Sequence, residues 1–201
     1  MYIIKNRHKI NWKKLSIFCF TIVITAFLIN GCARWPEEPN GGGGAGEKQL
    51  IVKVEINEEG TLNTDKGNYY IVFDTNKDAF FPPDDEIDNW QEGYYYVKLE
   101  DIGFFFGEVL EIGTSEQFIS GTQSENYFQV TISLADLGNP EGIHMNAITT
   151  DKDNETYDAL DTDFYINTSL LFPKTETDSL EDSTGGTDFD ITQVTTTILT
   201  P

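Results

Sequence analysis

Two acidic loops carry the side chains best suited to bind a cation. In the first loop, Asp74, Asn76 and Asp78 alternate, and alternate residues of a tight loop can direct their oxygens toward one centre. Ca²⁺ takes about six to eight oxygen ligands in proteins. Asp84 and Asp85 follow a few residues later and would help to complete such a site. The spacing therefore predicts a structural Ca²⁺ site.

A second acidic loop offers the same chemistry further along the chain. Its candidate ligands are Asp151, Asp153, Glu155 and Asp158. If the fold brings the two loops to one end of the domain, they could share a cation, and Ca²⁺ would then stabilise the folded state. The alternative is that both loops are ordinary solvated turns, because Asp and Asn are common turn residues.

Closely spaced aromatic residues form the second candidate binding feature. Tyr94 and Tyr96 are two positions apart, so a strand would direct both rings to the same side. Trp90 lies in a polar stretch and is expected to be the most exposed ring. Exposed rings can stack on sugars while nearby carboxylates bind hydroxyl groups, which predicts glycan binding. The alternative is that these rings pack in the core or in cross-strand pairs.

Signals for catalysis are weak. After residue 31 the chain has one histidine, His144, and a lone histidine in a strand is more often structural than catalytic. No Gly-x-Ser-x-Gly, His-Glu-x-x-His or phosphate-loop motif is present. A carboxylate pair could serve a glycoside hydrolase, but nothing singles out one pair among 34 Asp and Glu. We therefore expect no catalysis.

The N-terminal region resembles a bacterial lipoprotein signal. A basic segment is followed by the apolar run 15–29, and Gly31 precedes Cys32 in the sequence Leu-Ile-Asn-Gly-Cys. The resemblance implies cleavage before Cys32, lipidation of Cys32 and loss of residues 1–31. The apolar run has 15 residues, the length of a signal sequence, whereas a retained membrane anchor would need about 20.

This resemblance also implies a location outside the cytoplasm, with the protein anchored to a membrane through lipid. Ala33 follows the lipidated cysteine, where an aspartate would retain a lipoprotein in the inner membrane of a bacterium with two membranes. The outer membrane is therefore favoured in such a cell. Residues 32–47 are Gly-rich and are expected to form a flexible tether between the lipid and the domain.

The charge of the remaining chain excludes two classes of partner. Residues 1–31 contain five of the 13 Lys and Arg and no acid, so eight basic residues remain against 34 acids, a net charge of −26. Nucleic acids and anionic lipids are bound by clustered Lys and Arg. We therefore expect no nucleic acid partner, and contact with the bilayer through the acyl chains alone. Cys19 lies in the signal and Cys32 is the lipid site, which leaves no disulfide.

The elements that would position these residues are β-strands. Alternation of apolar and polar residues, or short β-rich runs, predicts strands at 50–56, 68–74, 94–99, 104–112, 127–134, 143–149 and 164–167. No stretch beyond residue 47 shows helical periodicity over three turns. Many short strands with turn signals between them predict an all-β fold, a single antiparallel β-sandwich of the jelly-roll or immunoglobulin-like type.

The domain boundaries follow from these patterns. We expect the sandwich over residues 48–172, an acidic loop rich in Thr and Ser over 173–187, and a final strand and tail over 188–201. The stretches Tyr69–Asp78 and Phe128–Gly138 resemble the sandwich domains of family 9 carbohydrate-binding modules and the DOMON superfamily. The resemblance implies a β-sandwich over about residues 48–167 and adds little about function.

These features predict an extracytoplasmic, membrane-anchored lipoprotein whose β-sandwich binds a ligand, with a glycan as the candidate. The alternative is a structural or assembly lipoprotein that contacts another envelope protein. A carboxylate-dependent glycoside hydrolase is the third candidate. Glycan binding predicts exposed rings on one face, a structural role predicts a flat patch, and a hydrolase predicts a cleft with two converging carboxylates.

Replacing Cys32 by serine tests the lipid anchor. The Cys32→Ser chain should incorporate no acyl label and should retain the mass of the precursor, because the acyl acceptor and the cleavage signal are both lost. Acyl labelling followed by mass spectrometry measures both effects. Cys19→Ser is the control and should be lipidated normally. Unchanged acyl labelling of Cys32→Ser would contradict the prediction.

Overall fold

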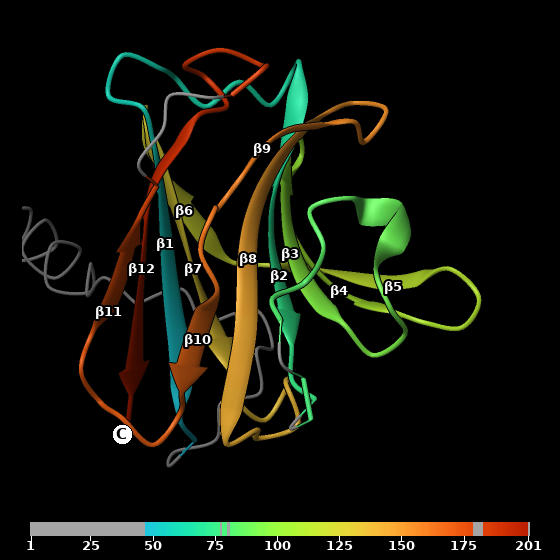
Figure 1. Ribbon diagram of the computed structural model, residues 1–201, viewed down its shortest axis with the longest axis vertical. Helices are drawn as coiled ribbons and strands as arrows, with labels where there is room; N and C mark the ends of the chain where they lie inside the picture. The colour runs from blue at the N-terminus through green and yellow to red at the C-terminus, as the bar shows by residue number, and fades with distance from the viewer. Residues whose placement is uncertain (1–46, 77, 80, 179–182, 201) are drawn as a thin grey trace, which may run out of the picture. The chain divides into compact units, whose positions relative to one another are not determined.

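The structure is a β-sandwich of two antiparallel sheets, which confirms the predicted all-β fold (Figure 1). The computed structural model describes residues 47–76, 78–79, 81–178 and 183–200. The predicted signal sequence, Cys32 and nearly all of the predicted tether lie outside the described residues. In the described part of the chain, no helix has the length and apolar character needed to span a bilayer.

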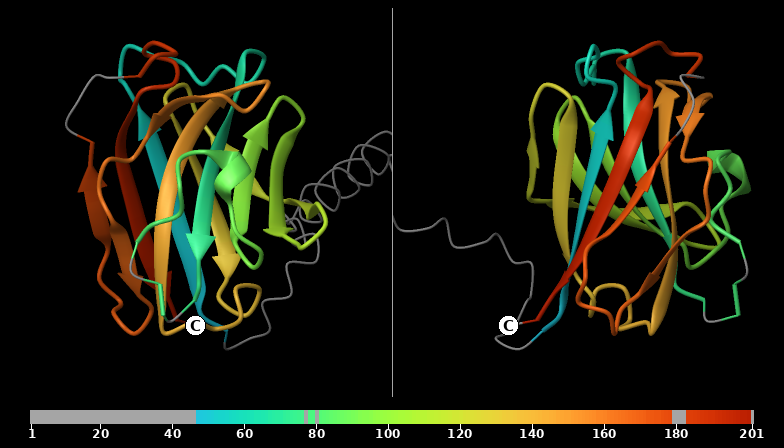
Figure 2. Two further views of the ribbon diagram at one scale, coloured as in Figure 1. Left: turned by 45° about the vertical axis from the view of Figure 1, so that its right-hand side comes forward. Right: turned by 60° about the vertical axis from the view of Figure 1, so that its left-hand side comes forward.

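The first sheet has β1 at its centre. Its strands, in spatial order, are β11 (Lys174–Thr177), β12 (Ile191–Leu199), β1 (Gln49–Ile56), β7 (Tyr127–Ser133) and β6 (Gly121–Gln123). β1 pairs with β12 from Gln49 opposite Leu199 to Ile56 opposite Ile191. The last strand of the chain therefore completes the sheet beside the first one, as Figure 2 shows.

The second sheet is larger and contains the predicted site residues. Its order is β10 (Phe164–Asn167), β8 (Gly142–Asp151), β2 (Gly67–Asp74), β3 (Tyr95–Glu100), β4 (Gly103–Val109) and β5 (Thr114–Ile119), and β9 (Thr156–Ala159) pairs with β8. The only helical element in the described residues is the short 3₁₀ helix η1 (Ile87–Asn89), in the segment between β2 and β3.

The core lies between the two sheets and follows the alternation of apolar residues. Every second residue of β1 is fully buried, starting with Leu50 and Val52. Tyr69 of β2 is fully buried as well. Its hydroxyl accepts the Asn63 N–H at 2.7 Å and donates to the Asp188 carbonyl at 2.8 Å. These bonds satisfy the polar end of a ring that packs in an apolar core.

The structure corrects several predicted strand boundaries. The strand predicted at 104–112 ends at Val109, and a turn through Gly113, which has a positive φ, leads into β5. β5, β6 and β9 were not predicted, because short or exposed strands lack buried alternation. The segment 173–187 was predicted to be a loop, but it contains β11, which pairs with β12 along the edge of the sheet.

Phe128 offers a test of this core. It is fully buried and its ring lies 5.9 Å from that of Tyr69 and 6.3 Å from that of Phe104. Phe128→Ala should lower the free energy of unfolding by about 3–5 kcal/mol, because it removes apolar contacts and leaves a cavity. Phe172→Ala is the matched control, and it should change stability by less than about 1 kcal/mol because Phe172 is exposed. Urea unfolding followed by circular dichroism measures both, and equal losses would contradict the packing described.

Candidate functional site

The three predicted ring residues meet on the outer face of the larger sheet. Tyr94 and Tyr96 belong to a second, smaller hydrophobic cluster together with Tyr70, Val72 and Ile148, and Trp90 packs against it. The segment between β2 and β3 crosses this face and brings Trp90 with it (Figure 1). Both faces of the larger sheet are therefore partly covered.

The rings pack on one another instead of standing open to solvent. Trp90 is half-buried, and its ring centroid lies 5.5 Å from those of Tyr70 and Tyr96. Its indole N–H donates to the Asp84 carbonyl at 2.9 Å. Tyr94 and Tyr96 are buried. The sequence suggested Trp90 as an exposed stacking ring, but the turn around η1 lays it on the tyrosines.

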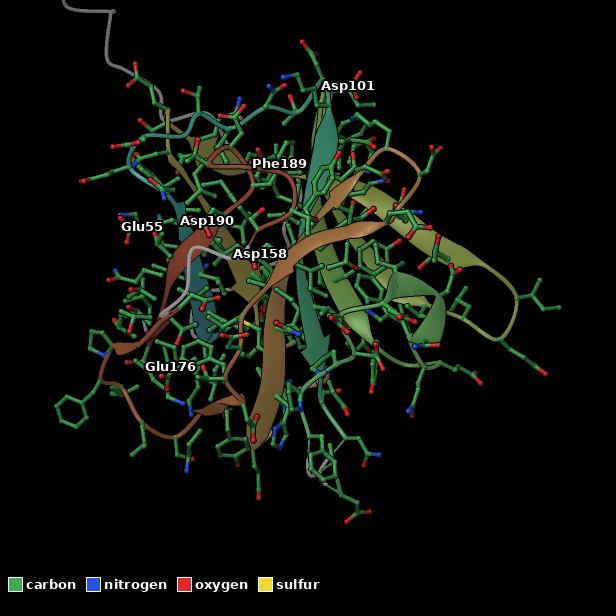
Figure 3. The ribbon with its side chains drawn as sticks, turned by 45° about the horizontal axis from the view of Figure 1, so that its top comes forward. Glu55, Asp101, Asp158, Glu176, Phe189 and Asp190 are labelled. Carbon is green, nitrogen blue, oxygen red and sulfur yellow. The ribbon has the colours of Figure 1, made fainter. Side chains whose placement is uncertain are left out.

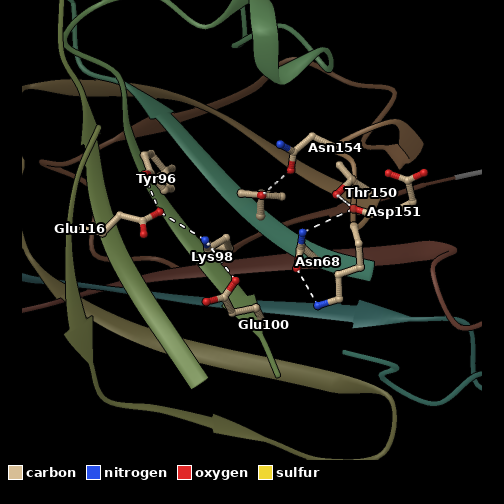
Figure 4. A network of polar contacts seen from close by, with 10 residues as sticks. Asn68, Tyr96, Lys98, Glu100, Glu116, Thr150, Asp151 and Asn154 are labelled. Atoms are coloured by element: carbon tan, nitrogen blue, oxygen red, sulfur yellow. Dashed lines mark hydrogen bonds and ion pairs between the residues drawn. The ribbon is translucent and has the colours of Figure 1, made fainter. Parts of the chain in front are cut away.

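Polar contacts fix the hydroxyl ends of these tyrosines (Figure 4). Tyr96 donates to Glu116 at 2.8 Å, and Glu116 also lies 3.4 Å from the ammonium group of Lys98. Tyr70 donates to Asn154 at 3.0 Å. A Cβ atom at position 107 would overlap the Tyr96 ring, so Gly107 is needed for the ring to lie across β4.

Burial controls the ionisation of these rings. Desolvation raises the pKa of Tyr70 and Tyr96 far above the ordinary tyrosine value, and the nearby Glu116 carboxylate raises both further. Desolvation in the main core raises the pKa of Tyr69 in the same way. At neutral pH the hydroxyl groups of Tyr70 and Tyr96 are therefore neutral donors.

The first predicted Ca²⁺ loop is organised as a series of turns. Asp74 Oδ1 accepts the Asn76 N–H at 2.8 Å, and Asn76 Oδ1 accepts the Asp78 N–H at 3.1 Å. Asp84 Oδ1 accepts the Glu86 N–H at 2.9 Å. These are the local side chain to backbone bonds that Asp and Asn make in turns.

The second predicted loop shows the same use of its oxygens. Asp151 Oδ1 accepts the N–H groups of Asp153 and Glu155 at 2.8 and 2.9 Å. Asp158 Oδ2 accepts the Ile191 N–H at 2.6 Å. Across the residues that the structure describes, no three His, Cys, Asp or Glu side chains gather closely enough to hold a metal ion. Ca²⁺ binding stays a prediction.

Some residues of the two predicted Ca²⁺ loops nevertheless line the same pocket. A pocket of about 580 Å³ lies between the segment 81–85 and the segment 156–161, and we call it the acidic pocket. Asp84 and Asp85 from the first predicted set and Asp158 from the second line it. The Thr156 hydroxyl donates to the Asp85 carbonyl at 2.8 Å, which ties the two walls together. The other predicted ligands of both sets do not line this pocket.

Asn146 lines the acidic pocket and was not predicted as a site residue. It lies on β8, is 5% exposed, and its Nδ2 donates to the Pro83 carbonyl at 3.1 Å. Its Oδ1 is buried without a hydrogen-bond partner. The available sequence signal was an amide between Met145 and Ala147 in β8, at an alternate position that faces away from the main core.

Phe81 is the other site residue that the sequence did not indicate. Its side chain is 78% exposed at the edge of the acidic pocket, far more than Trp90, Tyr94 or Tyr96. Four aspartates are among the residues that line the pocket, and their carboxylate oxygens accept hydrogen bonds. The pocket is thus suited to a ligand rich in donors that also has an apolar face.

A second acidic concavity of about 490 Å³ lies near the start of β12. Asp190 is almost fully buried there; its Oδ2 accepts the Asn57 Nδ2–H at 2.9 Å, and its Oδ1 has no hydrogen-bond partner. Figure 3 labels Phe189 and Asp190 on the segment that enters β12, and Asp158 on β9. The bond from the Ile191 N–H to Asp158 links this region to the acidic pocket.

Comparison of the chain with protein-family models, with curated proteins and with solved structures finds no match.

Alkaline titration tests the buried tyrosines. These tyrosines have a higher pKa in the folded chain than in the unfolded chain, where the ordinary value is about 10. The free energy of unfolding therefore falls as pH rises above about 10, because the unfolded chain then loses protons that the folded chain keeps. Tyr69, Tyr70 and Tyr96 should therefore ionise only as the protein unfolds. Absorbance at alkaline pH, followed together with circular dichroism, measures this. Above that pH, the free energy of unfolding of Tyr70→Phe should fall less than that of the unchanged chain, because the variant has no hydroxyl to ionise at this position. Ionisation of all tyrosines before unfolding would contradict the assignment.

Proposed function

We propose that this protein is a lipid-anchored, extracytoplasmic binding protein whose β-sandwich recognises a glycan through the acidic pocket, without catalysis. The observation that carries the proposal is the buried, unpartnered Oδ1 of Asn146 in a pocket edged by the exposed ring of Phe81. The lipid anchor is proposed from the sequence around Cys32, and the outer membrane is the proposed location in a cell with two membranes.

The unpartnered oxygen of Asn146 calls for a donor. A buried acceptor left without a hydrogen bond costs about 1–3 kcal/mol, and native proteins rarely leave one unsatisfied. The amide is held in place, because its Nδ2 is already bonded to the Pro83 carbonyl. Because Oδ1 is buried, a ligand hydroxyl can reach it only where the neighbouring side chains move aside, and that contact would remove this cost.

A glycan provides both features that the pocket can use. Its hydroxyl groups are donors for Asp84, Asp85 and Asn146, and the apolar face of a sugar ring can stack on Phe81. The pocket volume of about 580 Å³ lies within the usual range of about 300–1,000 Å³ for small-ligand sites. The pocket's carboxylates would disfavour acidic sugars, so we propose a neutral glycan.

One observation favours the alternative of an envelope-assembly protein. The hairpin of β4 and β5 exposes Leu110, Ile112 and Phe118, with exposed fractions of 42, 90 and 65%. The Phe118 ring packs on that of Phe105 in a tilted arrangement with ring centroids 4.2 Å apart, which gives the hairpin an ordered apolar surface. Such a surface suits contact with another protein.

Titration of the purified chain with neutral oligosaccharides tests the function. Xylo-, cello- and chito-oligosaccharides are the probes, and calorimetry measures binding. Phe81→Ala should weaken the affinity about tenfold, because it removes the stacking face at a cost near 1.4 kcal/mol. Phe118→Ala is the matched control at another exposed phenylalanine and should bind normally. Asn146→Leu should also weaken binding, and circular dichroism checks its fold.

The outcomes separate the candidate functions. Absence of binding, or equal affinity in Phe81→Ala and in the unchanged chain, would contradict glycan recognition at this pocket. Release of shortened products would show a hydrolase. The titrations are repeated with millimolar Ca²⁺ and with a chelator, because Asp84 and Asp85 are also proposed Ca²⁺ ligands. An affinity that requires Ca²⁺ would place the cation in the binding site.

A further inference from the structure

Three consecutive apolar side chains stand exposed in the loop that joins β10 to β11. Leu170, Leu171 and Phe172 are 55, 50 and 81% exposed. Single exposed apolar residues are ordinary, but three in a row form a continuous patch of the kind that marks an interaction site. We call residues 168–173 the apolar loop.

The base of the apolar loop is held by hydrogen bonds. The Thr168 N–H donates to the Glu141 carbonyl at 3.1 Å, and its hydroxyl donates to the Pro140 carbonyl at 2.6 Å. The Ser169 N–H donates to Asn167 Oδ1 at 2.9 Å. The side chains that follow are therefore presented to solvent from a fixed base.

This loop lies at the end of the sandwich where the described chain begins. Lys48 donates from Nζ to the Thr168 carbonyl at 3.3 Å, directly before β1 starts. Leu199, 44% exposed, lies opposite Gln49 at the end of β12 and adds to the apolar surface. Figure 1 shows the β10–β11 loop, the start of β1 and the C-terminus at the same end of the sheets.

The charge pattern around the loop differs from that of the rest of the chain. Residues 164–175 contain no Asp or Glu, the longest such run after Cys32 in a sequence with 34 acids. Lys48 and Lys174 lie at this end, and the Lys174 ammonium donates to the Tyr165 carbonyl at 3.0 Å. Exposed Asp136 and Glu141 on the neighbouring loop make the surroundings unfavourable for an anionic surface.

We propose that the apolar loop, together with Leu199, docks on the surface of the lipid bilayer and inserts its side chains among neutral headgroups. The proposal rests on the proposed lipid anchor at Cys32. Fourteen residues separate Cys32 from Glu47, so even a fully extended chain places the start of the domain within about 50 Å of the anchored residue. The anchor thus keeps a bilayer within reach of this end.

Tethering also explains why a small apolar patch is sufficient. Once the chain is anchored, docking is an intramolecular step with an effective concentration of the order of millimolar. Leucine and phenylalanine side chains are typical of segments that lie in the membrane interface. The charge of the chain led us to expect contact through the acyl chains alone; the structure adds an exposed apolar surface at the end of the sandwich where β1 begins.

Depth-dependent quenching in vesicles tests the docking. The full chain carries Cys19→Ser and one new cysteine for an environment-sensitive fluorophore, at Pro173→Cys beside the loop or at Glu111→Cys on the exposed β4–β5 turn as the control. The lipidated protein is reconstituted in phosphatidylcholine vesicles that contain nitroxide-labelled acyl chains. Quenching at position 173 should exceed that at position 111 by at least about twofold, because only the apolar loop enters the quencher's layer.

A loop variant supplies the matched control. Leu170→Asn, Leu171→Asn and Phe172→Asn together, in the Pro173→Cys chain, should reduce quenching to the level of position 111, and circular dichroism should be unchanged because these residues are exposed. Replacing part of the phosphatidylcholine by phosphatidylglycerol should weaken quenching at position 173. Equal quenching at both positions in protein that floats with the vesicles would overturn docking and leave the anchor intact.

Flotation separates this proposal from the proposed anchor. If the protein carries no lipid and does not float, the anchor is wrong, and the chain with Cys32→Ser added, labelled at its single remaining cysteine, is then mixed with preformed vesicles. Stronger quenching at position 173 than at position 111 would still support docking, and equal quenching would overturn it. Protection of position 173 only when envelope proteins are included in the vesicles would also overturn it in favour of a protein partner.

Discussion

The burial of β2 on both faces is the constraint on which the rest of the structure depends. All eight residues of Gly67–Asp74 are buried. Tyr69, Ile71 and Phe73 face the main core, while Tyr70 and Val72 face the outer cluster. A strand that carries apolar side chains on both sides needs a cover on each side. The first sheet covers one side, and the segment between β2 and β3 covers the other.

This double burial also creates the acidic pocket. The covering segment must cross the outer face of the sheet, and Trp90 fixes it there through its contacts with Tyr70 and Tyr96. The same segment carries Phe81, Asp84 and Asp85 toward β9, where the pocket forms. The pocket is thus a consequence of covering a second hydrophobic surface. Asp84, Asp85 and Asp158, which line the pocket, were predicted from the sequence as Ca²⁺ ligands and not as parts of a binding pocket.

Local sequence patterns were sufficient to predict the long strands, but they were not sufficient to predict the acidic pocket. Alternation located β1 and β7, and the continuous apolar run located β2, because each of these signals lies within a few residues. The pairing of β11 with β12 depends on residues far apart in the chain and has no local signal. Asn146 and Phe81 were missed for the same reason, since only the register of β8 and the path of the covering segment bring them together.

The pairing of β1 with β12 has a consequence for the kinetics of folding. Gln49 and Leu199 are direct partners although 149 residues lie between them in the chain. Closing so long a loop is entropically expensive, and folds dominated by such distant contacts fold slowly. The central strand of the first sheet also lacks one partner until the last residues of the chain are available. Export, which we propose for this chain, would require it to cross a membrane unfolded, and this order of events would keep the first sheet open until β12 has crossed.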